Sequence, residues 1–298
     1  MIEPDRLLFQ VEKLGRKEVI NRLHDIYCDA DDKKKRIRIL EILNQLRDKS
    51  HFKQIENYFL SDEDPNVRIE AAKLLAFNHE QKKAIKPLIW VFEHEKDEFV
   101  RLTALRLMVA LGHVRSEFLN MVVESLKKTL KSEDYKLKME AVESLGILKE
   151  KSAVNDLIME LKSKNKQVQL RVMQALETLG DERAVPHLLK ALGTASIDLW
   201  TYTFNALKKI RGPSLFEDLI SNLGGKADSI KEGYIRKGTA KALGFLGDKR
   251  AIRHLITLLD DQFYWVRWEA IEALDNLDYD WRKRYKYLLG NKILTIKR

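Results

Sequence analysis

Apolar residues recur along most of the chain with a helical spacing. In each repeating unit an apolar or small residue stands at a position that we number zero, and others follow four, seven, eight and eleven residues later. Val67, Ala71, Leu74 and Leu75 form one such set, and a second runs from residue 266 to residue 277. This spacing puts the apolar residues on one face of an α-helix and does not fit the two-residue alternation of a strand.

A Leu-Gly pair shows the length of the repeating unit. The pair occurs at residues 111, 145 and 179, each 34 residues after the last, and again at residue 246, which is 67 residues further on and about two periods. A fixed period in this range is typical of solenoid proteins. On this register a helix begins in each unit near Lys35, Val67, Val100, Asp134, Val168, Leu199, Ile235 and Val266.

Another helix precedes each of these, because a second apolar pattern stands before it. The segments AIKPLIWVF from Ala84, AVNDLIMEL from Ala153 and AVPHLLKAL from Ala184 share nearly the same aliphatic spacing. Each unit is therefore a helical hairpin, and neighbouring hairpins must stack to cover their apolar faces. The sequence predicts an all-α fold, a right-handed α-solenoid (α-α superhelix) of about eight helical hairpins.

The repeat also suggests how the chain is divided. We expect an N-terminal helical cap at residues 1–34, the repeats at 35–278 and a basic, aromatic C-terminal cap or tail at 279–298, all within one continuous domain. The segment from Gly224 to Gly233 holds extra length and is predicted to be a loop. Loops on such scaffolds absorb insertions and also contact partners.

The repeated segments resemble a known family. DPNVRIEAAKLLA from Asp64 and VQLRVMQALETLGDERAVPHLLKAL from Val168 resemble HEAT repeats, of the short type that phycobilisome lyases contain. The resemblance covers residues 35 to 277 and implies the architecture but no one function, since this fold hosts scaffolds, adaptors and a few enzymes.

The resemblance also implies a structural role for one arginine in most units. That arginine follows position zero and would join a ladder with acidic residues of neighbouring turns. The candidates are Arg36, Arg68, Arg101, Arg236 and Arg267. Tyr135 and Trp200 stand at this place in two units. We therefore expect the ladder to be interrupted in the middle of the chain.

Composition and charge narrow the possible partners. The formal net charge is +9, but residues 279 to 298 hold seven Lys or Arg and one Asp and so supply +6 of it. This distribution confines any binding of a polyanion to the C-terminal end. No apolar run is as long as a membrane span, and the N-terminus lacks a secretory signal, so we expect a cytoplasmic protein with no membrane partner. The single cysteine, Cys28, cannot form an internal disulfide.

The chain carries no recognisable catalytic signature. Deoxyhypusine hydroxylases share this repeat, and resemblance to them would imply iron bound by His-Glu pairs at the start of the second helices. Ile69 and Trp268 stand in the place of the histidine here. Because the repeat also explains most candidate nucleophiles and bases, we expect no enzyme activity, no cofactor and no metal.

The face opposite the apolar stripe is the candidate binding surface. A rotation of about 100° per residue places positions two, six and nine of each second helix on that face. Position two is apolar in five of eight units. These side chains either pack laterally between second helices or form an exposed ridge. The residues that we expect to bind a partner are Ile69, Lys73, Leu102, Arg106, Leu170, Lys208, Lys237, Lys241 and Trp268.

Two functions fit this surface. The first is a non-catalytic scaffold or adaptor that binds a protein or peptide partner through the concave face, which the second helices line in HEAT-type stacks. The alternative is a nucleic-acid-binding protein that uses the lysines from Lys208 to Lys241 and the basic tail. Within that alternative, FYWVRWEAIEAL from Phe263 and DLWTY from Asp198 resemble HEAT-like DNA glycosylases.

The register can be tested by truncating a side chain of the apolar stripe. Leu145→Ala or Leu179→Ala should lower the free energy of unfolding by about 2 to 5 kcal/mol, because each leaves a cavity in the predicted core. Thermal or denaturant unfolding measures the change. A folded variant that melts within about a degree of the parent would contradict the register.

Overall fold

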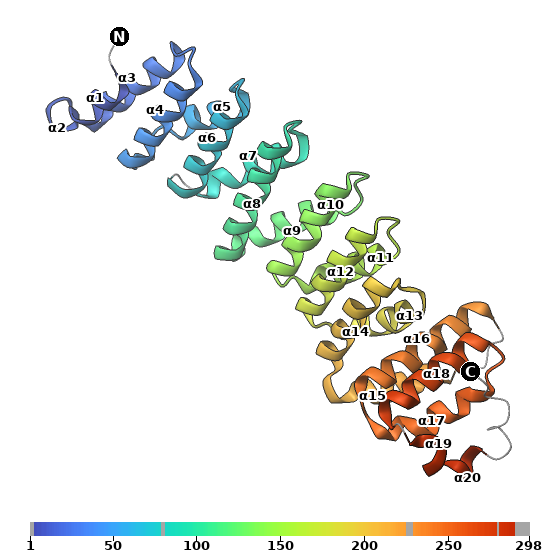
Figure 1. Ribbon diagram of the computed structural model, residues 1–298. Helices are drawn as coiled ribbons and strands as arrows, with labels where there is room; N and C mark the ends of the chain where they lie inside the picture. The colour runs from blue at the N-terminus through green and yellow to red at the C-terminus, as the bar shows by residue number, and fades with distance from the viewer. Residues whose placement is uncertain (1–2, 79–80, 225–228, 279, 290–298) are drawn as a thin grey trace. The chain divides into compact units, whose positions relative to one another are not determined.

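A computed structural model describes residues 3–78, 81–224, 229–278 and 280–289 (Figure 1). Within these ranges the chain is helical and no strand occurs. The chain forms two compact units, Met1–Leu126 and Lys127–Arg298. The all-α, helical-repeat class predicted from the sequence is confirmed, whereas the predicted division at residues 34 and 278 remains a prediction.

Unit 1 is built from helical hairpins that lie side by side. Its helices are α1 (Pro4–Leu8), α2 (Val11–Leu14), α3 (Arg16–Cys28), α4 (Lys33–Leu46), α5 (Phe52–Ser61), α6 (Pro65–Asn78), α7 (Gln81–His94), α8 (Glu98–Val114) and the start of α9 (Ser116–Thr129). The second helices α4, α6 and α8 pack against one another in that order, and α5 and α7 each pack against the second helix that follows (Figure 1).

Unit 2 continues the same pattern with shorter first helices. Its helices are α10 (Tyr135–Ile147), α11 (Val154–Glu160), α12 (Lys166–Leu179), α13 (Val185–Thr194), α14 (Ile197–Arg211), α15 (Leu215–Leu223), α16 (Ile230–Leu246), α17 (Ile252–Thr257), α18 (Tyr264–Leu277), α19 (Trp281–Arg284) and α20 (Lys286–Leu289). Short 3-10 turns lead into or extend the first helices at Lys151–Ala153, Glu182–Ala184, Gly212–Ser214, Lys249–Ala251 and Leu258–Asp260.

The apolar stripe forms the core in both units. Val67, Ala71 and Leu75 are fully buried in α6, and Leu145 and Leu179 are buried in α10 and α12. In α6 the small side chain of Ala71 lets neighbouring helices approach closely, and the branched residues around it fill the space between hairpins.

Local sequence signals set the helix ends. The side chain of Asp97 accepts hydrogen bonds from the backbone N–H groups of Phe99 and Val100 and so caps α8, and Asp134 and Asn165 cap α10 and α12 in the same way. Gly180 ends α12 at a φ of 61°, a left-handed conformation that glycine adopts without steric cost.

The start of α16 differs from the expected position. This helix begins at Ile230, five residues before the predicted Ile235, so the last part of the expected loop from Gly224 to Gly233 is helical. Ser229 caps the helix by accepting a hydrogen bond from the backbone N–H of Glu232. Residues 225–228 of that segment lie outside the described residues.

The packing of second helices changes between α14 and α16. Helices α10, α12 and α14 pack side by side, as do α16 and α18. On its N-terminal neighbour's side, however, α16 packs against the first helix α13 and not against the second helix α14 (Figure 1). Two glycines allow it. A Cβ on Gly193 would lie 2.6 Å from the Ile235 backbone, and one on Gly238 would overlap the carbonyl group of Leu192. Between α14 and α16 the backbones stay apart and only large side chains meet.

Substituting Gly238 tests whether this close approach stabilises unit 2. Gly238→Ala should lower the free energy of unfolding by about 1 to 3 kcal/mol, because the new methyl group overlaps backbone that cannot move aside alone. Gly146→Ala is the matched control. Its Cβ would meet Ala175 at an ordinary 3.4 Å, and alanine favours a helix interior by up to about 1 kcal/mol. Equal denaturation midpoints for the two variants would contradict the packing.

Candidate partner-binding surfaces

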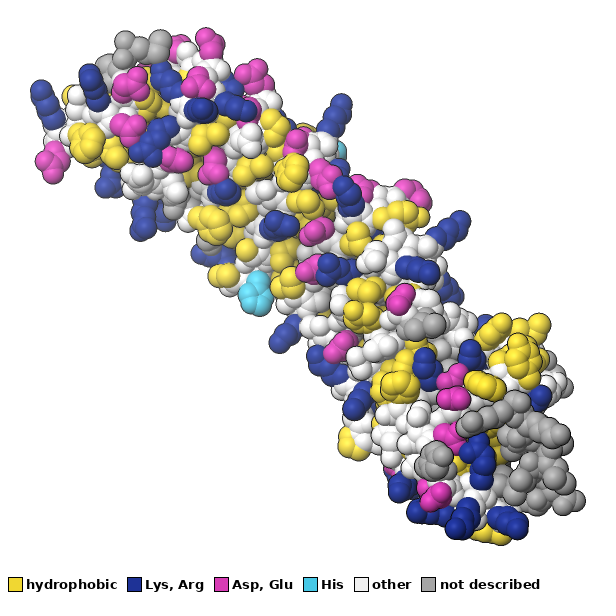
Figure 2. Space-filling view, in the orientation of Figure 1, with side chains coloured by type: hydrophobic (Ala, Val, Ile, Leu, Met, Phe, Trp, Pro, Cys, Tyr) yellow, Lys and Arg dark blue, Asp and Glu magenta, His cyan; other side chains and the backbone are white. Residues whose placement is uncertain are grey.

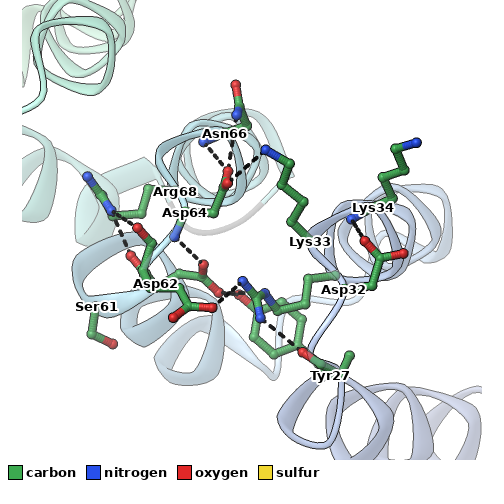
Figure 3. Close-up of polar contacts among 12 residues, drawn as sticks. Tyr27, Asp32, Lys33, Lys34, Ser61, Asp62, Asp64, Asn66 and Arg68 are labelled. Atoms are coloured by element: carbon green, nitrogen blue, oxygen red, sulfur yellow. Dashed lines mark hydrogen bonds and ion pairs between the residues drawn. The ribbon is translucent and has the colours of Figure 1, made fainter.

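A network of buried ion pairs joins the first repeats of unit 1 (Figure 3). Arg36 is 8% exposed, lies 3.2 Å from a carboxylate oxygen of Asp62 and donates a 2.9 Å hydrogen bond to the carbonyl oxygen of Ala30. The hydroxyl group of Tyr27 donates a 2.5 Å hydrogen bond to Asp62. Burial and the adjacent Asp62 carboxylate raise the pKa of Tyr27, which keeps its hydroxyl group protonated as a donor.

The same arrangement recurs along the chain. Four of the ladder arginines donate to the carbonyl oxygen six residues before them; the pairs are Arg36 with Ala30, Arg68 with Asp62, Arg101 with Glu95 and Arg267 with Asp261. The carboxylate of that preceding residue can pair with the arginine one repeat earlier. Glu95 lies 3.1 Å from Arg68, and Asp261 lies 2.6 Å from Arg236. One acidic residue therefore binds two successive arginines and connects their repeats.

In the middle of the chain other side chains take over this role. Gln169 stands where the arginine stands elsewhere and donates a 2.8 Å hydrogen bond to the carbonyl oxygen of Ser163, again six residues earlier. Ser163 itself offers no carboxylate. An ion pair of 2.9 Å between Lys138 and Glu160 joins α10 to α11 instead.

A second set of arginines lies in the turns between hairpins of unit 2. Arg183 donates a 2.7 Å hydrogen bond to the carbonyl oxygen of Lys151, and Arg211 pairs with Glu182 at 3.0 Å. These arginines were not among the residues predicted from the sequence. Its signal is Asp-Glu-Arg at residue 181 and Asp-Lys-Arg at residue 248, each just before a first helix.

The predicted ridge of unit 1 is half-buried. Ile69 and Leu102 are partly covered, because α6 and α8 pack side by side, whereas Lys73 and Arg106 are exposed. Lys73 pairs with Glu70 at 2.6 Å, and Arg106 has no acidic partner among the described residues. Phe77, which the prediction did not include, is 64% exposed. These five residues, Ile69, Lys73, Phe77, Leu102 and Arg106, form what we term the unit 1 face.

The prediction that position nine faces outward holds in only some units. Asn44, Glu143 and Lys208 are exposed there, whereas Ala76, Val109 and Gly244 are buried. In the units of Ala76 and Gly244, position ten is turned by a further 100° and is exposed in Phe77 and Phe245. In these two units the open face is rotated away from the direction that a single isolated helix would give.

In unit 2 the predicted residue Leu170 is half-buried on α12. A shallow cavity of about 210 Å³ lies nearby between α10 and α12, in the space that Gly146 leaves. Arg171 and Glu143 pair at 3.3 Å on its lining. The cavity is small and its charged groups pair with one another.

Large side chains fill the space between α14 and α16. The rings of Trp200 and Phe204 stack at 5.3 Å, and the ring of Phe245 lies 5.0 Å from Trp200. The ammonium group of Lys241 lies 4.3 Å from the centre of the Trp200 ring. Trp200 and Phe204 are buried, whereas Phe245 is 61% exposed. We term these four residues the wedge.

The other predicted residues of unit 2 lie on α14, α16 and α18. Lys208 is exposed on α14, Trp268 is exposed on α18, and Lys237 is half-buried on α16. Burial raises the pKa of Glu269, while Lys237 and Lys241 act in the opposite direction. The carboxyl group of Glu269 is therefore near both lysines.

The remaining aromatic residues of FYWVRWEA have structural contacts. Trp265 stacks on Phe263 at 4.7 Å and on Tyr234 of the preceding second helix at 5.5 Å. Figure 2 shows hydrophobic side chains gathered over the N-terminal ends of α16 and α18, where Tyr234 and Tyr264 are exposed. The rings join α18 to the preceding repeat.

The described part of the tail packs against α18. Trp281 is fully buried, and its indole N–H donates a 2.7 Å hydrogen bond to Asp275. Arg282 also pairs with Asp275, and Arg284 pairs with Asp278. Tyr279 and residues 290–298 lie outside the described residues.

Metal sites and membrane-spanning helices are both absent from the described part of the chain. It contains no group of three or more His, Cys, Asp or Glu side chains placed to hold a metal ion. Among its helices, none has both the length and the apolar character needed to cross a membrane.

Removing the Asp62 carboxylate tests the ladder. Asp62→Asn should lower the free energy of unfolding by about 3 kcal/mol, because it leaves the buried Arg36 guanidinium without its buried counter-ion. Glu63→Gln is the control. Glu63 also pairs with Arg36, but its side chain is 81% exposed, so the loss should stay below about 1 kcal/mol. Urea denaturation compares the two, and similar losses would contradict the ladder's role.

Comparison with known proteins agrees with this architecture. The family model for HEAT repeats matches residues 17–109, 54–129, 123–203 and 202–275. No curated protein matches the chain. Among solved structures, a mutant of Kap121p aligns with a TM-score of 0.61 and 14% identity, over 96% of this chain and 36% of that one. This likeness concerns the fold alone.

Two other structures are similar at lower scores. Human deoxyhypusine hydroxylase in complex with glycerol aligns at 20% identity and a TM-score of 0.38, over 90% of this chain and 99% of that chain. The CpcE and CpcF complex of phycocyanin lyase from Nostoc sp. PCC7120 aligns at 22% identity and a TM-score of 0.42, over 76% and 94%. Since the repeat model covers most of the sequence and the structure consists of its hairpins, the chain belongs to the HEAT-repeat family.

Proposed function

We propose that this protein is a non-catalytic cytoplasmic scaffold that binds an acidic, amphipathic segment of a partner protein through the unit 1 face. The observation that carries the proposal is the exposure of Phe77 on α6 and of Arg106 on the adjacent helix α8, where Arg106 lacks an acidic partner among the described residues. A large exposed ring and an unpaired guanidinium on one helical face are suited to a partner and add little to the fold.

The chemistry of the face defines the partner. Ile69, Phe77 and Leu102 offer an apolar strip to the apolar side of a helix or an extended peptide. Arg106 offers a charge that an acidic side chain of the partner would pair with, and the planar guanidinium can bind a carboxylate through two hydrogen bonds. Charge complementarity therefore favours Asp or Glu next to the apolar residues of the partner.

The residues at the start of the second helices support a non-catalytic role. Ile69 and Trp268 stand where resemblance to deoxyhypusine hydroxylases would place a histidine ligand, and neither side chain can bind a metal. The contacts of Trp281, Arg282 and Arg284 within the chain give the described tail a packing role, which favours a protein partner over a nucleic acid.

A pull-down from native cell extract tests the unit 1 face. Leu102→Asp combined with Arg106→Glu should reduce capture of the partner at least about tenfold, because it removes an apolar contact and reverses the charge. Arg106→Glu alone changes only an exposed side chain and should also weaken capture without altering the melting temperature.

Lys86→Glu is the matched control, since Lys86 is exposed on the first helix α7. It makes the same change in net charge as Arg106→Glu, away from the unit 1 face. If a folded double variant captures every partner that the parent captures, the proposed surface is wrong.

A further inference from the structure

The space that the wedge occupies between α14 and α16 results from the way α16 packs on α13. Gly193 and Gly238 bring α16 onto α13, so α14 and α16 do not pack backbone to backbone as α10, α12 and α14 do. Trp200, Phe204 and Phe245 occupy the space between them, and Phe245 remains largely exposed at its edge. The wedge thus combines a buried aromatic floor with an open aromatic rim.

The polar groups at the wedge are hydrogen-bond donors without acceptors. The Lys241 ammonium group lies against the Trp200 ring and has no carboxylate within ion-pair distance among the described residues. The indole N–H of Trp200 and the hydroxyl group of Ser196, one helical turn earlier, are buried and have no hydrogen-bond partner there. Buried donors are normally paired, so this excess is a cost that an acceptor from outside would relieve.

We propose that the wedge binds a carboxylate adjacent to a large apolar side chain, as in a partner peptide where Glu or Asp stands next to Phe or Leu. The carboxylate accepts hydrogen bonds from Lys241, and the apolar side chain packs on the exposed face of Phe245. This inference rests on the proposed function and adds a second contact site, in unit 2, for the same chemical class of partner.

The charges around the wedge favour this ligand over two others. Lys237 and Lys241 repel a cationic side chain that approaches the rings, although aromatic rings alone would attract one. Glu269 lies near the same lysines and Glu272 lies near Glu269, and these carboxylates disfavour the dense negative charge of a nucleic-acid backbone. A single carboxylate on an apolar segment satisfies the donors at the least electrostatic cost.

Nuclear magnetic resonance of the full-length protein tests the proposal. The chain has five tryptophans, and a Trp200→Phe variant identifies the indole N–H signal of Trp200. The probe is the peptide acetyl-Glu-Phe-Glu-Phe-amide, which should shift that signal in a saturable way. Lys241→Met should weaken binding about tenfold, because it removes the charge but keeps the length of the side chain. Phe245→Ala should weaken it independently.

Controls separate this site from general charge effects. Lys190→Met changes an exposed lysine on α13 that contacts none of the three rings, and it should leave the peptide affinity unchanged. The peptide acetyl-Lys-Phe-Lys-Phe-amide should not shift the signal. Three results would each overturn the proposal. They are equal binding of the two peptides, tighter binding of a six-nucleotide oligothymidylate than of the acidic peptide, and an unchanged peptide affinity in Lys241→Met.

The outcome is independent of the unit 1 face. Arg106→Glu should leave the peptide-induced shift of Trp200 unchanged, because Arg106 lies in unit 1 and the wedge in unit 2. Loss of partner capture in the unit 1 variants together with no shift at Trp200 would overturn this inference and leave the proposed function standing. A shift at Trp200 without such loss would support the wedge and contradict the unit 1 face.

Discussion

No hairpin of this protein can cover its own apolar face, and the rest of the structure follows from that constraint. Each repeat must pack against the next, so the residues that matter most for stability lie between repeats. Val67, Ala71 and Leu75 supply the apolar part of that contact. The acidic residue before each second helix supplies the polar part, since Asp62 or Asp261 binds its own arginine through the carbonyl group and the preceding arginine through the carboxylate. The arginine and the acidic residue therefore join two repeats only as a pair. In the unit that has neither, Gln169 stands in place of the arginine and Ser163 in place of the acidic residue.

The sequence predicted the repeat well because the repeat is a local pattern. Spacing within one helix determines which residues enter the hairpin core, and Leu145 and Leu179 are buried as expected. Contacts between repeats are harder to predict, since they depend on how far neighbouring helices are displaced and rotated. This is why Ala76 and Val109, opposite the stripe of an isolated helix, proved to be buried. Phe77 and Phe245 were missed for the same reason. They stand at position ten, which is exposed in these two units because lateral neighbours cover position nine instead.

The departure at α16 shows how a repeat protein acquires an individual feature. Two glycines in different repeats, Gly193 and Gly238, remove the side chains that would keep α16 away from α13. Their spacing matches no element of the 34-residue pattern, so the sequence alone does not connect them. Once α16 moves onto α13, the space beside α14 must be filled by long or aromatic side chains, and Trp200, Phe245 and Lys241 fill it. The aromatic cluster is thus a consequence of a backbone contact several residues away.

The ion pairs of the charged side chains indicate more about possible partners than the net charge does. Most of the formal excess of +9 lies in the C-terminal 20 residues, where Arg282 and Arg284 are already paired with acids of the last repeat. The ladder arginines Arg36, Arg68 and Arg236 likewise have acidic partners in their own chain. Arg106 and Lys241 are among the cations that have no acidic partner in the described residues, and each belongs to a pair of helices that exposes a large ring, Phe77 in one unit and Phe245 in the other. The proposed recognition of acidic and apolar side chains together depends on these two cations and on those exposed rings.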